Sequence, residues 1–117
     1  MRERELHGAV VLFLGYALPD GAVLHHSPNE GKRGWNAQRD LKASGARKGW
    51  PDLEILWQGR AYFLELKAPR KYPTADQRGV HSLLRAAGCQ VCTVRSVAEA
   101  EMALSGWGLP LRARIAA

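Results

Sequence analysis

Apolar residues near the start of the chain recur every three to four positions, the spacing that places them on one face of a helix. Phe13 lies beside this stripe, and the Pro19-Asp20-Gly21 run that follows contains residues that end helices and begin turns. The pattern predicts an amphipathic helix over residues 2–18. The stripe consists of Leu6, Val10, Leu14 and Ala17.

Two further helices are predicted from capping boxes, in which Ser or Thr precedes Glu or Gln by three residues. Thr74 with Gln77 opens the first of these helices, and Ser96 with Glu99 opens the second. The two helices are expected to extend to Ala87, with Gly88 as the stop, and to about Ser105.

Four segments have the aliphatic, aromatic and β-branched content of strands. Gln58-Gly59 separates two of them and suits a two-residue hairpin turn, because glycine tolerates positive φ. With that loop, paired residue numbers sum to 117, which places Asp52 across from Glu65; a loop one residue longer or shorter moves the pairing. The strands are expected at residues 22–26, 53–57, 60–67 and 89–95.

The predicted order is helix, strand, strand, strand, helix, strand, helix, which describes an α/β fold with a central mixed sheet. The hairpin is antiparallel, whereas the helical connection from 60–67 to 89–95 suits a parallel crossover. With 117 residues, 46% of them hydrophobic, the chain is large enough for one core and short for two. We expect a single domain over residues 1–117, with the apolar tail after Gly106 packed on the domain or on another subunit.

The chain is basic, with 17 Lys and Arg against 11 Asp and Glu and a formal net charge of +6. Much of this charge lies in the polar, glycine-rich segment 27–51, where a short helix over 37–44 is expected before Gly45. A basic surface favours an anionic partner such as nucleic acid. The N-terminus is charged and the apolar run 9–14 is too short to cross a bilayer. We therefore expect no membrane partner and a soluble, cytoplasmic protein.

Two acids and a lysine meet at the predicted hairpin. Glu65 and Lys67 share a face because alternate strand residues point the same way, and Asp52 lies opposite Glu65. Two ionised carboxylates about 5 Å apart repel by roughly 3 kcal/mol at an effective dielectric near 20, and a divalent cation reverses the sign of that energy. Mg²⁺ prefers oxygen ligands, so Asp52, Glu65 and the backbone carbonyl of Leu66 are candidate ligands for Mg²⁺ or Mn²⁺. Lys67 would orient or deprotonate a water, or stabilise negative charge, during phosphodiester hydrolysis.

Each of these side chains also has a structural explanation. Asp52 can be a turn acid, and Glu65 with Lys67 can be a solvated ion pair on an edge strand. The apolar residues Ala61 and Phe63 share the face of Glu65, however, and a solvated face is less natural there. Taken together, the residues favour a site.

Other residues that could bind metal or act in catalysis also have structural explanations. Cys89 and Cys92 have the spacing of a metal or redox pair. In a strand, however, that odd spacing sends the thiols to opposite faces, so we interpret both as small buried hydrophobic residues. The adjacent His25 and His26 face opposite ways for the same reason and are not expected to share an ion. His81 is expected to be an ordinary helix-face residue, and the capping box alone explains Gln77.

Pro51-Asp52 followed by Glu65-Leu66-Lys67 resembles the PD-(D/E)xK nuclease signature, and the surroundings resemble more specifically the VRR-NUC branch of that superfamily. The resemblance covers most of the chain and consists of an ordered set of motifs at compatible spacing. Its further elements are Glu3-x-x-Leu6, the segment SPNEGKR, Leu41-x-x-x-Gly45, Gly49-x-Pro51-Asp52-Leu53, Gln77 and Gly88 leading into residues 91–96.

The resemblance implies a restriction-endonuclease-like αβββαβ core and a divalent-metal-dependent DNA endonuclease. It assigns Asp52 and Glu65 as metal ligands, Lys67 as the catalytic lysine and Gln77 as a supporting active-site residue. Small stand-alone members of the family, often from phages, resemble Holliday junction resolvases and act as homodimers; a phage-encoded protein would work in the host cytoplasm.

The resemblance also implies that an acid of the first helix approaches the site and can join the metal. Glu3 stands at the matching position, and Glu5 is a substitute. The family commonly has a glutamine after that acid, and this chain has His7 there.

The leading hypothesis is thus a metal-dependent endonuclease, acting as a homodimer on branched or junction DNA. Phosphate contacts are expected from four basic residues. The alternative is a non-catalytic nucleic-acid-binding module on the same fold, which has no need of clustered acids facing phosphate. A restriction-type enzyme with base-specific readout has little support because no recognition domain is evident. The four basic residues are Arg33, Lys48, Arg70 and Lys71.

Overall fold

The computed structural model describes residues 1–27 and 45–115. Within these ranges the chain forms three helices and four strands in the predicted order, so the expected α/β fold is confirmed. The helix expected at 37–44, and Arg33 with it, lie outside the described residues. The helices are α1 (Glu3–Ala17), α3 (Ala75–Ala86) and α4 (Val97–Gly106), and the strands are β1 (Val23–His26), β2 (Leu53–Trp57), β3 (Arg60–Leu66) and β4 (Gln90–Val94).

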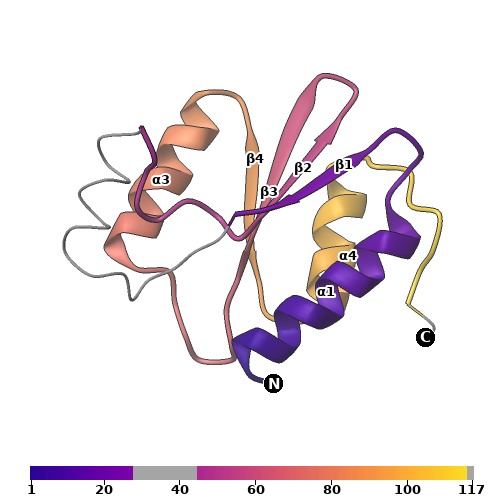
Figure 1. Cartoon of the computed structure of the whole chain (residues 1–117), viewed down its shortest axis with the longest axis horizontal. Helices are drawn as coiled ribbons and strands as arrows, with labels where there is room; N and C mark the ends of the chain where they lie inside the picture. The colour runs from indigo at the N-terminus through magenta and orange to yellow at the C-terminus, as the bar shows by residue number, and fades with distance from the viewer. Residues whose placement is uncertain (28–44, 116–117) are drawn as a thin grey trace.

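The four strands form one mixed sheet in the order β1-β2-β3-β4. β1 and β3 run antiparallel to β2, and β4 runs parallel to β3 after the crossover through α3 (Figure 1). The crossover helix returns the chain to the starting end of the sheet, which a parallel pair requires. The predicted mixed sheet is therefore correct in both its antiparallel and its parallel parts.

The hairpin between β2 and β3 has the register expected from its turn. Leu53 pairs with Leu64 and Trp57 pairs with Arg60. Gln58 and Gly59 have φ values of 48° and 75°, the left-handed pair of a type I′ turn, whose twist matches that of the flanking strands. One step beyond the last pair, this register brings Asp52 opposite Glu65.

Helices cover both faces of the sheet, with α3 on one side and α1 and α4 on the other (Figure 1). Because strand residues alternate between faces, β3 contributes to two separate cores. Its residue Phe63 packs under α3, whereas Leu64 packs under α1 and α4. The α3 side buries Phe63, Val80, Leu84 and Val91; the α1 and α4 side includes Leu6, Val10, Leu14, Ile55, Leu64 and Leu104.

The two capping boxes turned out differently. At α3, the Thr74 hydroxyl accepts the Gln77 N–H at 3.2 Å and the Gln77 side-chain oxygen accepts the Thr74 N–H at 2.8 Å, so this box is confirmed. At α4, the Ser96 hydroxyl accepts the Glu99 N–H at 3.0 Å, but the Glu99 carboxylate accepts the N–H of Arg95 instead. The second box is therefore present in one direction only.

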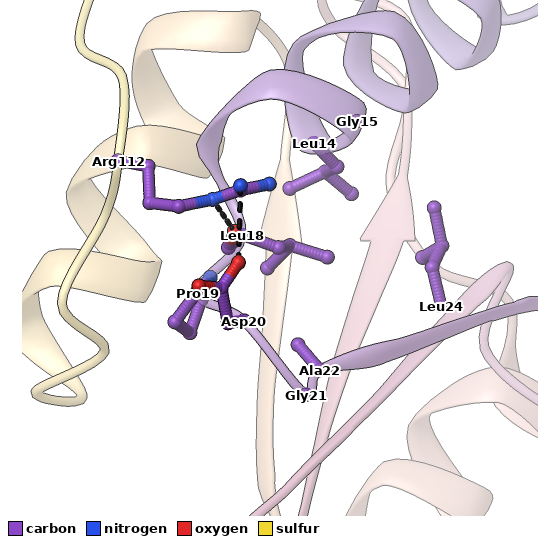
Figure 2. A pocket seen from close by; sticks show the side chains of 9 residues that line it. All are labelled: Leu14, Gly15, Leu18, Pro19, Asp20, Gly21, Ala22, Leu24 and Arg112. Atoms are coloured by element: carbon purple, nitrogen blue, oxygen red, sulfur yellow. Dashed lines mark hydrogen bonds and ion pairs between the residues drawn. The ribbon is translucent and has the colours of Figure 1, made fainter.

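The C-terminal tail packs on the domain and closes the end of α1. The Arg112 N–H donates to the Ala17 carbonyl at 2.7 Å, and its side chain donates to the Leu18 carbonyl and to Asp20 (Figure 2). These bonds satisfy carbonyls that the last helical turn leaves without partners. A hollow of about 260 Å³ lies beside them, between the end of α1 and the start of β1.

The two cysteines lie on opposite faces of the sheet, as their spacing predicts. Cys89 packs with the core under α3 and Cys92 with the core under α1 and α4. Both are free thiols that pack against the cores as expected, although each is only partly buried. No helix in the described part of the chain is long and apolar enough to cross a membrane.

Candidate active site

Asp52 lies at the entrance to β2 and reaches across to the end of β3. Its carboxylate accepts the backbone N–H of Leu66 at 2.7 Å, between the two other residues of the predicted constellation. The preceding Pro51 is fully buried and Asp52 is half-buried. The predicted meeting of the proline-aspartate pair with the Glu65-Leu66-Lys67 segment is thus present in the structure.

Glu65 is the most deeply buried charged residue described, with 1% of its surface exposed. Burial, together with a hydrogen bond and the negative charge of Asp52, raises the pKa of Glu65 to about 9, although Lys67 acts in the opposite direction. At neutral pH, and without a cation, Glu65 therefore carries a proton. Two neighbouring carboxyls cannot readily both ionise, so the proximity of Asp52 adds to the effect of burial on Glu65.

Lys67 faces the first turn of α1. Its ammonium lies 3.7 Å from a carboxylate oxygen of Glu3, and the lysine side chain is only 12% exposed. The start of α1 and the end of β3 lie side by side in Figure 1, which explains the approach. Glu3, and not Glu5, is the helix acid that the structure brings to Lys67.

Two buried polar side chains of α3 contact Glu65. His81 Nε2 lies 3.0 Å from one carboxyl oxygen, and Gln77 Nε2 lies 3.5 Å from the other. The two residues are 3% and 6% exposed and lie one helical turn apart, so they share the face that packs on the sheet. Gln77 thus uses its oxygen in the capping box and its nitrogen at Glu65, so the capping box does not prevent contact with the candidate site.

The sequence interpretation of His81 as a helix-face residue is correct, but it missed the buried contact of His81 with Glu65. Its four-residue spacing from Gln77 is the signal that could have found it, since whatever buries Gln77 also buries His81. Burial lowers the pKa of His81; the positive charge of Arg85 acts in the same direction, whereas the negative charge of Asp52 opposes it. A raised pKa of Glu65 and a lowered pKa of His81 both favour the uncharged forms, so the contact is described better as a hydrogen bond than as an ion pair.

Gly49 fixes the approach of the Pro51-Asp52 segment to α3. It has a φ of 92°, and a Cβ atom there would lie 2.6 Å from the backbone carbon of Asp76 and 2.8 Å from the nitrogen of Gln77. Neither the conformation nor the space admits a side chain. The glycine therefore brings the backbone that carries Asp52 directly against the helix that carries Gln77 and His81.

Histidines of α1 and β1 lie at the edge of the same site. The rings of His7 and His26 are 4.4 Å apart in an edge-to-face arrangement. Burial and His26 lower the pKa of His7, while the charge of Asp52 raises it. His25 points the other way, with its Nδ1 3.9 Å from Glu54, as expected for its position next to His26.

The donor set suits a hard divalent cation that keeps most of its waters. In residues 1–27 and 45–115, no group of three or more His, Cys, Asp or Glu side chains is arranged to hold a metal ion. Mg²⁺ is commonly bound through one or two carboxylates, and Asp52 with Glu65 supplies these. The N–H of Leu66 points toward Asp52, and its carbonyl faces the same side because a strand residue presents both groups together.

Three of the four predicted basic contacts are described, one beside the start of α3 and two on the β3–α3 connection. Lys48 is exposed, and its ammonium lies 3.4 Å from Asp76 at the start of α3. Arg70 and Lys71 are exposed on the connection itself, and Arg70 has a φ of 67°. All three residues therefore flank the helix that carries Gln77.

Comparisons with known proteins bear on the fold. By sequence, no protein-family model and no curated protein matches the chain. Among solved structures, one described as a VRR_NUC domain protein superposes with a TM-score of 0.70 at 18% identity, covering 92% of this chain and 88% of that one. Another, a VRR_NUC domain, gives 0.62 at 21% identity, covering 92% and 98%. The chain therefore has the fold of VRR-NUC nuclease domains.

Proposed function

We propose that this chain, on its VRR-NUC-like fold, is a Mg²⁺- or Mn²⁺-dependent endonuclease that hydrolyses phosphodiester bonds in DNA. The observation that carries the proposal is the meeting of Asp52, Glu65 and Lys67 at one end of the sheet. Burial and Asp52 hold the pKa of Glu65 near 9, an arrangement that costs free energy unless a cation is bound.

The proposed metal ligands are the carboxylates of Asp52 and Glu65 with the carbonyl of Leu66; Glu3 is a further candidate. A bound divalent ion supplies charge neutralisation at the phosphate and lowers the pKa of a coordinated water. His81 and Gln77 contact the two oxygens of Glu65 and limit its rotation. Hydrogen-bonded partners of this kind keep a carboxylate in the orientation that coordination needs.

Lys67 is the proposed catalytic lysine. It has little solvent around it and an acidic partner in Glu3, so its ammonium is held in place beside the two carboxyls. From there it can orient the attacking water by hydrogen bonding and stabilise the negative charge that develops on the phosphate. Glu3 acts through Lys67 in this scheme, as a positioning residue.

Binding of DNA is proposed to involve Lys48, Arg70, Lys71 and Arg33, in keeping with the net charge of +6. The preference for branched or junction DNA and the homodimeric state rest on the resemblance to small stand-alone, phage-type nucleases. The alternative of a non-catalytic binding module predicts the same salt-dependent DNA binding, but no cleavage.

The test compares DNA cleavage by the wild-type protein and by Asp52→Asn, Glu65→Gln and Lys67→Met. Each substitution should lower the cleavage rate by at least about a hundredfold, the usual effect of removing one preorganised charged group. Circular dichroism and thermal unfolding check that the variants fold, and Asp20→Asn, in an acid that is 93% exposed, should cut like wild type. Full activity in any of the three site variants would sink the assignment.

The role of Glu3 has its own comparison. Glu3→Gln should slow cleavage because Lys67 loses its partner, whereas Glu5→Gln should leave the rate unchanged. The opposite result would show that the wrong acid of α1 has been chosen. Activity retained in EDTA would count against any metal-dependent mechanism.

A further inference from the structure

Tyr72 is unusually exposed for a large aromatic residue beside a buried site. It lies on the connection between β3 and α3, five residues after Lys67, and 74% of its surface is exposed. The guanidinium of Arg95 lies over its ring, 5.1 Å from the centroid. Arg95 can hold one face of the ring by a cation–π interaction, so the high exposure leaves the other face to solvent.

The surrounding backbone holds this pair in position. The Arg95 side chain donates to the Lys71 carbonyl at 2.8 Å, and the Arg78 side chain donates to the Pro73 carbonyl at 2.7 Å. Tyr72 therefore lies between two residues whose carbonyls are both bonded. The ring is presented on an ordered loop, and a ligand that stacks on it need not first order the loop.

The backbone of Arg95 begins beside that of the proposed catalytic lysine. Leu66 pairs with Val94 in the parallel ladder, and the Lys67 N–H donates to the Val94 carbonyl at 3.1 Å. Lys67 and Arg95 are thus the first residues after the ends of two adjacent strands, β3 and β4, whose separation is about 5 Å. Residues in register on parallel strands share a face, so Arg95 and Lys67 start from the same side of the sheet.

The chemistry around the ring is that of a nucleic-acid ligand. Arg95 lies over the Tyr72 ring, Arg78 bonds the carbonyl of the next residue, Pro73, and Arg70 and Lys71 directly precede Tyr72 in the chain. A phosphate alone would bind the cations without using the ring. A purely apolar ligand would pack on the ring without using the cations. A nucleotide needs both, because it has a base with a π-face and a charged phosphate.

We propose that Tyr72, backed by Arg95, is a stacking platform for an unpaired nucleobase adjacent to the phosphodiester that is cut. In a paired duplex the faces of each base are occupied by its neighbours, so the ring gains nothing there. At a branch point, a flap or a single strand, one base face is free. The platform therefore gives the site a preference for DNA with an unpaired base. The proposal rests on the proposed function for its location beside the cleaved bond.

The experiment measures binding in a Lys67→Met background, which prevents cleavage, to two otherwise identical duplexes. One carries a single extrahelical 2-aminopurine, and in the other the 2-aminopurine is paired. Fluorescence anisotropy gives the two dissociation constants, and 2-aminopurine quenching reports stacking on the ring. The variants are Tyr72→Ala, Tyr72→Phe and, as the matched control, Tyr16→Ala, in another tyrosine that is 68% exposed.

Tyr72→Ala should weaken binding of the extrahelical duplex by roughly tenfold and abolish the quenching, with paired-duplex affinity unchanged. Tyr72→Phe and Tyr16→Ala should behave like the Lys67→Met background alone. Equal losses on both duplexes, or no loss on either, would overturn the platform. A separate assay measures cleavage of paired DNA with Lys67 intact. Metal-dependent cleavage by Tyr72→Ala would support the proposed function even if the stacking platform is overturned. No cleavage by the wild-type protein would reject the proposed function and leave the stacking result unaffected.

Discussion

Binding of Mg²⁺ is expected to displace a proton from Glu65. Because its pKa is raised to about 9, the carboxyl is mostly protonated at neutral pH in the absence of metal. A carboxylate must be deprotonated to coordinate, so binding should release about one proton per ion. The apparent affinity should rise by about tenfold for each pH unit until the pH approaches the pKa, and then level off.

Isothermal titration calorimetry in two buffers of different ionisation enthalpy measures this release directly. The difference between the apparent binding enthalpies gives the number of protons passed to the buffer. Mn²⁺ is a useful second titrant. Asp20→Asn should release as many protons as wild type, because Asp20 lies in the turn after α1 and pairs with Arg112. Glu65→Gln should bind weakly and release none.

Two results would refute this reasoning. Normal metal binding with the same apparent enthalpy in both buffers would mean that Glu65 is already ionised, or is not a ligand. Proton release by Glu65→Gln equal to that of wild type would assign the proton to another group.

Other predictions concern stability and support. Without metal, the pKa of Glu65 is near 4.5 in the unfolded protein and near 9 in the folded protein, so between these values the folded state holds one more proton and its stability falls as pH rises. Denaturant unfolding should show the wild-type unfolding constant rising by up to tenfold per pH unit relative to Glu65→Gln. A slope of opposite sign would contradict the raised pKa. His81→Ala leaves a buried oxygen of Glu65 without its partner, so it should cost about 1 to 3 kcal/mol of unfolding free energy and weaken metal binding by about tenfold or more; unchanged metal affinity would reject a supporting role. Gly49→Ala should lower the free energy of unfolding more than Gly88→Ala. The two glycines have similar φ values of 92° and 93°, but only at Gly49 would a Cβ atom lie 2.6 to 2.8 Å from backbone atoms. Equal effects would mean that this close approach does not affect stability. Arg112→Ala should cost about 1 kcal/mol through its bonds at the end of α1, and more than Asp20→Asn, as measured by chemical unfolding.

Local rules in the sequence predicted the elements and the hairpin register because each depends on neighbouring residues. The Gln58-Gly59 turn sets the pairing of β2 with β3, and that pairing in turn brings Asp52 opposite Glu65. The alternation along β3 similarly predicted that Glu65 would share a face with Phe63. These relations hold wherever the helices pack, so no tertiary information was needed.

The partners of these residues depend on how α1 and α3 cross the sheet, which no local pattern specifies. The sequence pattern showed that Gln77 caps a helix but not that its free nitrogen would reach Glu65, nor that His81 would do the same. Glu3 was chosen by resemblance, and its contact with Lys67 follows from the position of α1 beside the end of β3. Side-chain partners across elements are thus where the sequence interpretation was incomplete or wrong.

Nicking of supercoiled plasmid DNA by wild type and by Glu65→Gln, purified in parallel, shows whether the chain is a metal-dependent nuclease. The wild-type protein should nick the plasmid with Mg²⁺ or Mn²⁺ and stop when EDTA is added, and Glu65→Gln should bind the DNA without nicking it. No nicking by folded wild-type protein with either metal, or equal nicking by both proteins, would contradict a metal-dependent nuclease centred on Asp52, Glu65 and Lys67.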